Sequence, residues 1–356
     1  MQYSGRLQQY IDQIEEPDPR MIRQSVEHWD HIAKPLHGLG DFEDMISKIA
    51  GIQNRVDVDI SKKAVVVMCS DNGVVQEGVT QTDSSVTAVV TENFARGIAS
   101  VNRMAARAGA DVIPVDIGVA SDLTENGIWN RKISYGTNNL AKEPAMTREQ
   151  AIMAICHGIE LVETCKEQGY GILATGEMGI GNTTTSSAVA SVLLGLPVKS
   201  VTGPGAGLSK EKVLHKIQVI EEAVRVNRPD RNDPLDVLSK IGGYDIAGMT
   251  GLYLGGAVCR IPVVIDGVIS GLAALIASRI CPKTVHYMLP SHMGKEPACQ
   301  AVMQELGLKP VIHGNLALGE GTGAVMLFPL LDMVWEVYNE YSTFTEVHIE
   351  TYQKFE

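Results

Sequence analysis

Short apolar runs, each leading into a glycine-containing loop and then into a helical pattern, recur through the middle of the chain. Apolar strands that alternate with helices are typical of a parallel sheet covered by helices on both faces. We therefore expect an α/β fold built on a Rossmann-like parallel sheet, with ligands bound where loops leave the carboxyl ends of the strands. The runs that predict strands are residues 64–69, 111–119, 170–175, 198–202, 262–265 and 284–289.

The two ends of the chain differ from this middle region, because both are helical in pattern, amphipathic and richer in charge. Chain termini often lie close together in a folded domain. We therefore predict a large Rossmann-like catalytic domain over residues 45–325 and a small helical domain formed by residues 1–44 and 326–356. Thr147 with Gln150 forms a capping box that opens one helix of the large domain. Other helical patterns span residues 86–108, 208–226, 244–258 and 268–281.

Charge and composition exclude several classes of protein. The net charge is −12 and no basic stripe is present, so we expect no nucleic-acid partner. No uninterrupted apolar run reaches the roughly 18 residues of a membrane helix. The polar, acidic start also lacks the apolar region of a signal peptide, so we expect a cytoplasmic protein with no membrane partner. The six cysteines form no C-x-x-C pair, which favours idle thiols over a metal or redox site.

Four glycine-rich loops carry the candidate chemistry. Closely spaced glycines allow backbone N–H groups to point at an anion, and the N-terminus of the next helix adds a favourable dipole. Residues 179–185 and 203–207 are therefore candidate anion sites, although neither matches the dinucleotide fingerprint or a P-loop. The four loops are residues 70–80, 175–185, 202–207 and 318–323.

Two of these loops each place a glutamate, Glu177 or Glu320, among glycines. A lone glutamate in a turn is usually solvated, and spacing alone favours that interpretation. If the site is enclosed, however, burial raises the pKa of a carboxylate toward the range useful for a general base.

Several longer motifs carry a more specific signal. They are DFEDMISKIAGIQ (41–53), DNGVVQEGVT (71–80), GEMGIGNTT (176–184), GPGAG (203–207), GGYDIAGMTGLYLGGA (242–257), PVVIDGVISGLAALIA (262–277), SHMGKEP (291–297) and LALGEGTGA (316–324). In this order they closely resemble the nicotinate-nucleotide–dimethylbenzimidazole phosphoribosyltransferase family, over roughly residues 40–335. GEMGIGNTT and LGEGTGA are very specific to that family.

This resemblance implies a reaction and a set of residues. The family transfers phosphoribosyl from nicotinate mononucleotide to a benzimidazole nitrogen, giving an α-riboside phosphate and nicotinate, and so builds the nucleotide loop of cobalamin-type cofactors. Its fold is a Rossmann-like domain with a small helical domain drawn from both termini, assembled as a homodimer. Glu320 is implied as the general base, and Glu177 as the residue that supports the developing cationic ribose or positions the base. The residues implied to bind substrate are Thr80, Met178, Gly179, Gly181, Asn182, Thr183, Gly203, Gly205, Gly207, Lys216, Asp266, Ser291 and Leu318. For Asp266 the implied role is either a contact with a ribose hydroxyl or the fixing of a neighbouring loop.

The chemistry of such a transfer needs a base but neither an acid nor a metal. The leaving nitrogen belongs to a pyridinium that already carries positive charge, whereas the incoming azole or phenol is a weak nucleophile until its proton is removed. The donor has one phosphate and no pyrophosphate, so no Mg²⁺ clamp is needed. We therefore predict no metal and no cofactor.

The chain departs from the family pattern where the acceptor is expected, at Asn72, Thr80, residues 82–83, Ala88 and Gly294. The acceptor therefore stays open among dimethylbenzimidazole, another benzimidazole, adenine and a phenol such as p-cresol, whose hydroxyl has an ordinary pKa of about 10. Some phenol-activating relatives act as two paralogous chains, so a heterodimer, or a structural or regulatory paralogue with little activity alone, is an alternative. An NAD-dependent dehydrogenase is a second alternative, which the missing dinucleotide fingerprint disfavours.

Overall fold

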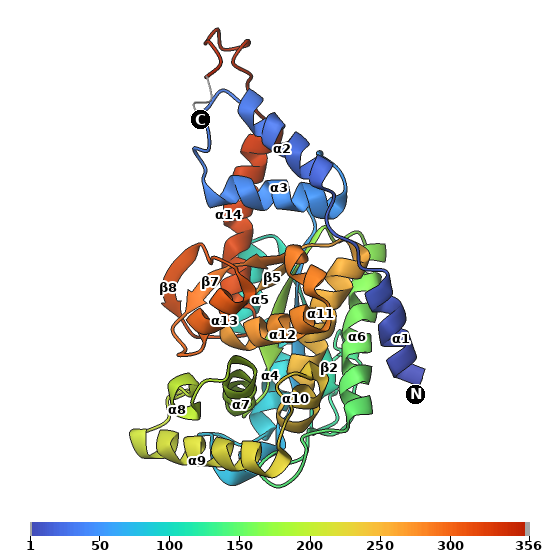
Figure 1. Ribbon diagram of the computed structural model, residues 1–356, viewed down its shortest axis with the longest axis vertical. Helices are drawn as coiled ribbons and strands as arrows, with labels where there is room; N and C mark the ends of the chain where they lie inside the picture. The colour runs from blue at the N-terminus through green and yellow to red at the C-terminus, as the bar shows by residue number, and fades with distance from the viewer. Residues whose placement is uncertain (1, 353–356) are drawn as a thin grey trace.

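The structure, a computed structural model, describes residues 2–352. Its centre is a six-stranded parallel sheet in the order β3-β2-β1-β4-β5-β6 (Figure 1). The predicted α/β fold with a Rossmann-like parallel sheet is thereby confirmed. The strands are β1 Lys63–Ser70, β2 Ala110–Gly118, β3 Trp129–Asn130, β4 Ile172–Met178, β5 Val263–Ile265 and β6 Met288–Pro290.

The strand order changes direction between β1 and β4, because β2 and β3 extend the sheet on one side and β5 and β6 extend it on the other. Open parallel sheets bind ligands outside the carboxyl ends of their strands at such a switch point. β1 ends at Ser70 and β4 ends at Met178, which pairs in register with Cys69. The topology therefore places a site in the loops that follow these two strands.

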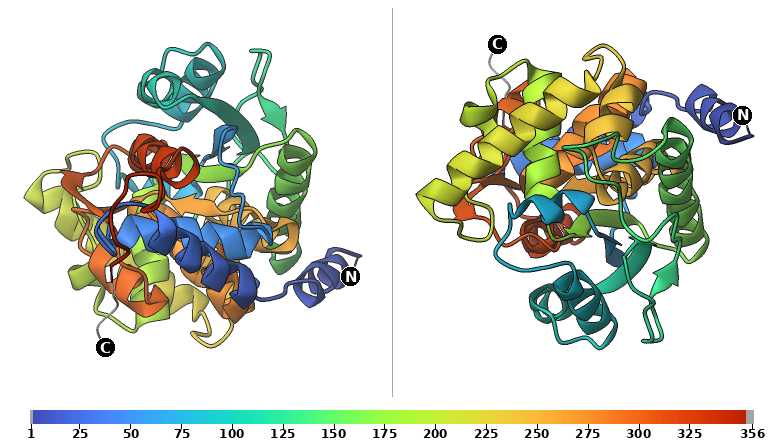
Figure 2. Two further views of the ribbon diagram at one scale, coloured as in Figure 1. Left: turned by 90° about the horizontal axis from the view of Figure 1, so that it is seen from above. Right: turned by 90° about the horizontal axis from the view of Figure 1, so that it is seen from below.

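Helices cover both faces of the sheet (Figures 1 and 2). Successive side chains of β1 point to opposite faces, and each set is buried in its own apolar cluster. The cluster that includes Val65 and Val67 draws on α2 Pro19–His31, α3 Asp41–Gln53, α4 Ser85–Ala95, α5 Ser100–Arg107 and α14 Thr322–Asn339. The cluster that includes Val66 and Met68 draws on α1 Gln2–Asp12, α6 Arg148–Glu167, α7 Asn182–Leu194, α9 Lys210–Asn227, α10 Pro234–Ile241, α11 Tyr244–Cys259, α12 Gly267–Ile280 and α13 Cys299–Leu306. Within residues 2–352, none of the helices has both the length and the apolar character that crossing a membrane requires.

α14 connects the 318–321 loop to the helices near the N-terminus. It begins at Thr322, and its far end lies beside α2 and α3 at one end of the molecule (Figure 1). Near that end, the Tyr338 hydroxyl lies 2.9 Å from Ser25 Oγ, and the Tyr338 ring packs against Trp29 with centroids 4.8 Å apart. The helix continues through the predicted domain boundary at residue 325, and the division into two domains stays a prediction.

The strand predicted at residues 198–202 is wrong, because the segment forms the short helix α8 Val198–Val201. Thr202 Oγ1 donates to the Val198 carbonyl at 2.7 Å and closes this single turn. A short apolar run does not distinguish a buried strand from a buried helical turn, and the sheet has no place for this segment between β4 and β5.

Two further boundaries differ from the prediction, and three short strands were not predicted. Residues 284–289 lie mostly in the 3-10 helix η2 Pro282–Tyr287, and β6 begins only at its end. The single helix predicted over residues 86–108 is divided into α4 and α5, because Gly97 adopts a φ of +74° and ends the first helix. The unpredicted strands are β3 and the parallel pair of β7 His292–Gly294 with β8 Ile312–Leu316.

α6 and α11 approach each other through glycines. A Cβ atom placed on Gly158 would lie closer than 3.0 Å to the Gly248 carbonyl oxygen, and one placed on Gly251 would lie as close to the Ile155 carbonyl oxygen. The two helices therefore pack backbone against backbone. This contact holds α11, whose first turn carries Asp245 beneath the site described below.

We expect Gly158→Ala to lower the free energy of unfolding by about 1–3 kcal/mol or more, because the added methyl group overpacks this contact. Alanine is otherwise about 1 kcal/mol better than glycine inside a helix. Gly5→Ala in α1 is the matched control, since a Cβ atom at Gly5 meets no heavy atom within 4 Å. Urea unfolding of the two variants, followed by circular dichroism, measures the difference. Equal stabilities would contradict the backbone-to-backbone packing.

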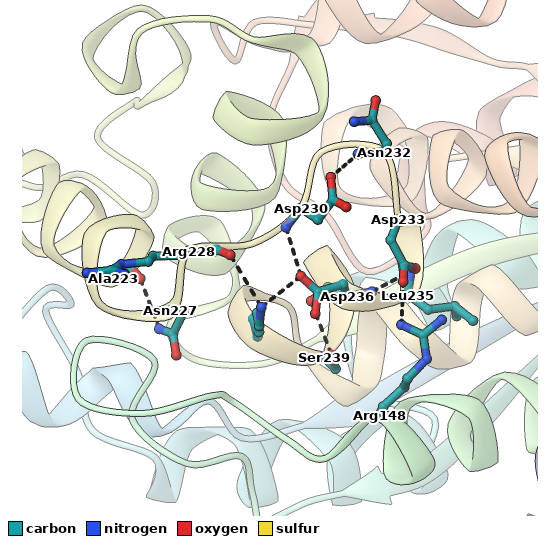
Figure 3. Close-up of polar contacts among 11 residues, drawn as sticks. Arg148, Ala223, Asn227, Arg228, Asp230, Asn232, Asp233, Leu235, Asp236 and Ser239 are labelled. Carbon is teal, nitrogen blue, oxygen red and sulfur yellow. Dashed lines mark hydrogen bonds and ion pairs between the residues drawn. The ribbon is translucent and has the colours of Figure 1, made fainter.

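A polar network fixes the connection between α9 and α10 (Figure 3). Asp233 caps α10 by accepting the N–H of Asp236 at 3.1 Å, and it pairs with Arg148 of α6 at 2.7 Å. Asp236 in turn accepts the N–H of Asp230 at 2.8 Å. These contacts fix the loop between α10 and α9, the helix that carries Lys216.

Candidate active site

A cavity of about 420 Å³ lies at the carboxyl end of β4. Its walls come from the loop after β4, the first turns of α7, the 203–206 loop, the 295–298 segment and the 317–320 loop. Loops far apart in sequence thus meet at the switch point of the sheet. The predicted site residues that line the cavity are Glu177, Met178, Gly179, Asn182, Thr183, Gly203, Gly205, Lys216, Leu318 and Glu320.

Asp266 and Ser291 lie behind the lining of the cavity. Asp266 Oδ2 accepts the N–H of Gly321 at 3.0 Å, and Asp266 Oδ1 accepts the N–H of Ala324 at 2.9 Å. The carboxylate therefore fixes the Glu320 loop and the first turn of α14. Ser291 Oγ donates to the Ile265 carbonyl at 2.6 Å and ties β5 to the segment that follows β6.

The remaining predicted residues, Thr80, Gly181 and Gly207, are also outside the lining. The Thr80 hydroxyl donates to the Thr82 carbonyl at 2.7 Å. Gly181 is the N-cap of α7. The Gly207 carbonyl accepts a hydrogen bond of 2.5 Å from Gln81 Nε2, which joins the 80–83 segment to the 203–207 loop. These residues shape the surrounding loops.

Glu320 occupies a run of left-handed backbone. Its φ is +62°, between Gly319 at +84° and Gly321 at +86°. A side chain in this conformation is strained, and such strain is found where the surrounding structure fixes a functional residue. Glu320 Oε2 accepts the N–H of Val101 in the first turn of α5 at 3.2 Å. Burial raises the pKa of the Glu320 carboxyl above its ordinary value of 4.5, and this hydrogen bond opposes the rise.

Glu177 lies at the end of β4, where its carboxylate accepts a hydrogen bond from Asn182 Nδ2. The same Asn182 Nδ2 lies 3.3 Å from Asp245 Oδ2. Burial, followed by the charges of Asp245 and Asp266, raises the pKa of Glu177 well above its ordinary value. Burial also raises the pKa of Asp245 to about 6 and that of Asp266 to about 7. Glu177 in the cavity wall and the two aspartates behind it therefore form a group of carboxyls that do not all carry charge at neutral pH.

Lys216 supplies positive charge to the wall of the cavity. Its Nζ donates to Thr183 Oγ1 at 2.8 Å and lies 3.5 Å from the Gly203 carbonyl oxygen, and burial lowers its pKa to about 8. In the described part of the chain no carboxylate pairs with this ammonium group. Thr183 lies in the first turn of α7, and the positive end of a helix dipole at such an N-terminus also favours an anion. The arrangement suits an anion such as a phosphate.

Sequence reasoning did not single out several residues that line the cavity, among them Ser186, Ser187, Lys295 and Glu296. Ser186 and Ser187 lie about one helical turn beyond Asn182 and Thr183, and this spacing could have indicated them. Within residues 2–352, Ser186 Oγ is buried and has no hydrogen-bond partner. A buried hydroxyl without a partner beside an anion site is a candidate ligand contact. Lys295 and Glu296 lie in the SHMGKEP motif, which was the available signal for them.

Sheet topology, an anion pocket and buried carboxyl groups in one cavity define a Rossmann-like enzyme with a site for a phosphorylated substrate. Residues 14–349 match the model of a family described as phosphoribosyltransferase. The chain belongs to this phosphoribosyltransferase family, as its motifs predicted.

Similar proteins give the same result over nearly the whole chain. The nicotinate-nucleotide–dimethylbenzimidazole phosphoribosyltransferase of Clostridium acetobutylicum is 45% identical over 347 residues, which are 98% of this chain and 99% of that protein. The protein of the same name from Acetivibrio thermocellus is 49% identical over 324 residues, 91% of this chain and 92% of that protein. The crystal structure of CobT from Thermus thermophilus superposes with a TM-score of 0.88 at 36% identity, covering 93% of this chain and 99% of that one.

The predicted enzyme class is therefore confirmed, and the chain is a transferase that uses a nicotinate nucleotide. These comparisons give no support to a structural or regulatory paralogue or to an NAD-dependent dehydrogenase. Within the described residues, no group of three or more His, Cys, Asp or Glu side chains is arranged to hold a metal ion.

Proposed function

We propose that this chain transfers phosphoribosyl from nicotinate mononucleotide to a benzimidazole-type base, releasing nicotinate and an α-riboside 5′-phosphate for the nucleotide loop of a cobamide. One observation carries the assignment of the site. A single cavity joins the cationic pocket of Lys216 to the carboxyl group of Glu320, whose pKa is raised by burial. The phosphate of the donor needs the cationic pocket of Lys216, and activation of the acceptor needs the carboxyl group of Glu320.

In this proposal the donor phosphate lies against Lys216, Thr183 and the 203–205 loop, with Ser186 Oγ as a further donor. Phosphate contacts of this kind use a fixed cation together with the N–H groups of a helix N-terminus. The ribose then extends toward Glu177 at the end of β4. Thr183 and Glu177 both line the cavity and belong to adjacent elements, α7 and β4, which supports one continuous binding mode.

The proposed chemical step needs one proton acceptor. Glu320 removes the N–H proton of the acceptor, and the freed electron pair forms the bond to C1′ of the ribose. The bond between C1′ and the pyridinium nitrogen breaks, and its electron pair neutralises the nicotinate ring. Attack on the face opposite nicotinate converts the β-riboside into the α-riboside. Glu177 supports the cationic ribose of the transition state, because positive charge developing beside a carboxyl group favours its ionised form.

The acceptor is proposed to occupy the part of the cavity near Glu320, where Met178, Val268 and Leu318 provide apolar walls. The departures from the family pattern lie outside that lining. Asn72 is buried behind it, and its Nδ2 lies 3.4 Å from the Ile180 carbonyl oxygen. This placement favours a benzimidazole, the base in the relatives' name, over adenine or a phenol.

The proposal is tested by measuring nicotinate release from nicotinate mononucleotide by the purified chain. The acceptors to compare are dimethylbenzimidazole, benzimidazole, adenine and p-cresol. We expect nicotinate release to be fastest with a benzimidazole. Faster release with p-cresol would correct the acceptor, and no release with any acceptor would refute transfer by this chain alone. Release only after addition of a paralogue would support a heterodimer. We propose a homodimer instead, and light scattering of the purified chain measures its oligomeric state.

A further inference from the structure

A second cavity, of about 390 Å³, shares no lining residue with the first. It lies between α2 and α3 on one side and η2 with the end of α13 on the other. Ile22, Val285, Leu306 and Leu308 give it largely apolar walls. Its size falls within the range of roughly 300–1,000 Å³ that is typical of small-molecule sites.

Lys48 of α3 brings a cation into these apolar surroundings. Its Nζ donates to the Met288 carbonyl at 2.6 Å and lies 3.4 Å from the Val285 carbonyl oxygen. An ammonium group has three N–H donors, so two carbonyls leave one donor and the whole charge without a matching anion. No carboxylate of the described residues pairs with Lys48. Burial lowers its pKa to about 8, which leaves it mostly protonated at pH 7.

The acid that lines this cavity, Glu16, does not neutralise Lys48. Its Oε2 lies 3.5 Å from His286 Nε2, and the two side chains are 55% and 54% exposed, respectively. They form the solvated rim, whereas Lys48 lies deeper. Lys48 is half-buried, and a charge partly removed from water without a partner favours a counter-ion.

We propose that this cavity binds a small organic anion, with a carboxylate on Lys48 Nζ and a compact apolar or aromatic body against Ile22, Val285 and Leu308. A carboxylate supplies the missing charge and accepts the remaining N–H in a charge-assisted hydrogen bond. The apolar walls favour a ligand with a hydrocarbon body over a small inorganic anion, which would leave them in contact with water. The site is independent of the transferase reaction.

Benzoate and its neutral isostere benzamide test this site by saturation-transfer NMR and calorimetry on the whole chain. Saturating nicotinate mononucleotide occupies the donor part of the catalytic cavity, and Lys48→Met distinguishes binding at Lys48 from binding in the acceptor part. We expect benzoate to bind at least about tenfold more tightly than benzamide, and Lys48→Met to remove that preference. Lys283→Met is the matched control, because Lys283 also donates to a backbone carbonyl, that of Ile14 at 3.0 Å, but does not line the cavity.

Benzoate binding weaker than about 1 mM, equal binding of benzamide, or unchanged binding in Lys48→Met would each overturn the proposal. Lys48→Met should release nicotinate at the wild-type rate, because Lys48 lies outside the catalytic cavity. Thermal unfolding reports whether this variant folds. If it does not fold, the comparison of benzoate with benzamide on the wild-type chain decides the question.

Discussion

Replacing Glu320 with glutamine is expected to lower kcat by about 10²-fold or more, because the amide has no basicity to remove the acceptor's proton. Glutamine keeps the shape of the side chain, and its amide oxygen can still accept the N–H of Val101, which Glu320 Oε2 accepts at 3.2 Å. Donor binding should therefore change by less than about threefold, an effect below about 1 kcal/mol. Steady-state nicotinate release gives kcat, and calorimetry with nicotinate mononucleotide gives the donor Kd.

Glu296→Gln is the matched control for this experiment. Glu296 lines the same cavity, and burial raises its pKa as it does that of Glu320. The proposed reaction gives Glu296 no proton to move, so this variant should keep kcat within about tenfold of wild type. A loss equal to that of Glu320→Gln would mean that the base has not been identified.

The pH dependence of the activity provides a second test of the role of Glu320. Glu320 must be deprotonated to act as a base, and burial raises its pKa above the ordinary 4.5. Activity should therefore increase as pH rises through that raised value, and the acid limb of kcat/KM should lie above pH 4.5. In Glu320→Gln this limb should be absent from the residual activity.

Much of the site could be predicted because parallel strands all present their carboxyl ends at one edge. A sequence that runs from an apolar strand into GEMGIGNTT places Glu177, Asn182 and Thr183 at that edge, whatever the details of packing. The prediction failed where only distant contacts decide the structure. Residues 198–202 are apolar enough for a strand, but the neighbours of β4 in the sheet are already β1 and β5, so the segment turns into α8.

The roles of the residues that support the site could also not be predicted from the sequence. Asp266 was implied to bind substrate or to fix a loop, and its hydrogen bonds to Gly321 and Ala324 place it under the Glu320 loop across more than 50 residues of chain. In the sequence alone, Lys48 is an ordinary polar residue of an amphipathic helix. Its environment depends on where η2 and α13 pack, and no local periodicity encodes that arrangement.

Lys216→Met is expected to raise the donor KM by about 30-fold or more, because truncating one member of a buried charge pair commonly costs about 2–5 kcal/mol. Methionine keeps the apolar stem of this side chain, which is 1% exposed, so the packing of α9 on α7 is retained. Lys212→Met on the same helix is the control, since Lys212 is exposed and its side chain lies outside the cavity. Nicotinate release at increasing donor concentration gives the KM of each variant.

Stability separates loss of binding from loss of folding in Lys216→Met. Without substrate, the ammonium group of Lys216 is buried with neutral partners, and burial lowers its pKa to about 8. Because the variant no longer buries this charge, the free chain should unfold at the same or a higher temperature than wild type. Nicotinate mononucleotide should raise the Tm of the wild type much more than that of the variant, since only a ligand that binds the folded state stabilises it. A variant with normal stability and an unchanged donor KM would remove Lys216 from the phosphate site and leave the first turn of α7 as the anchor of the donor.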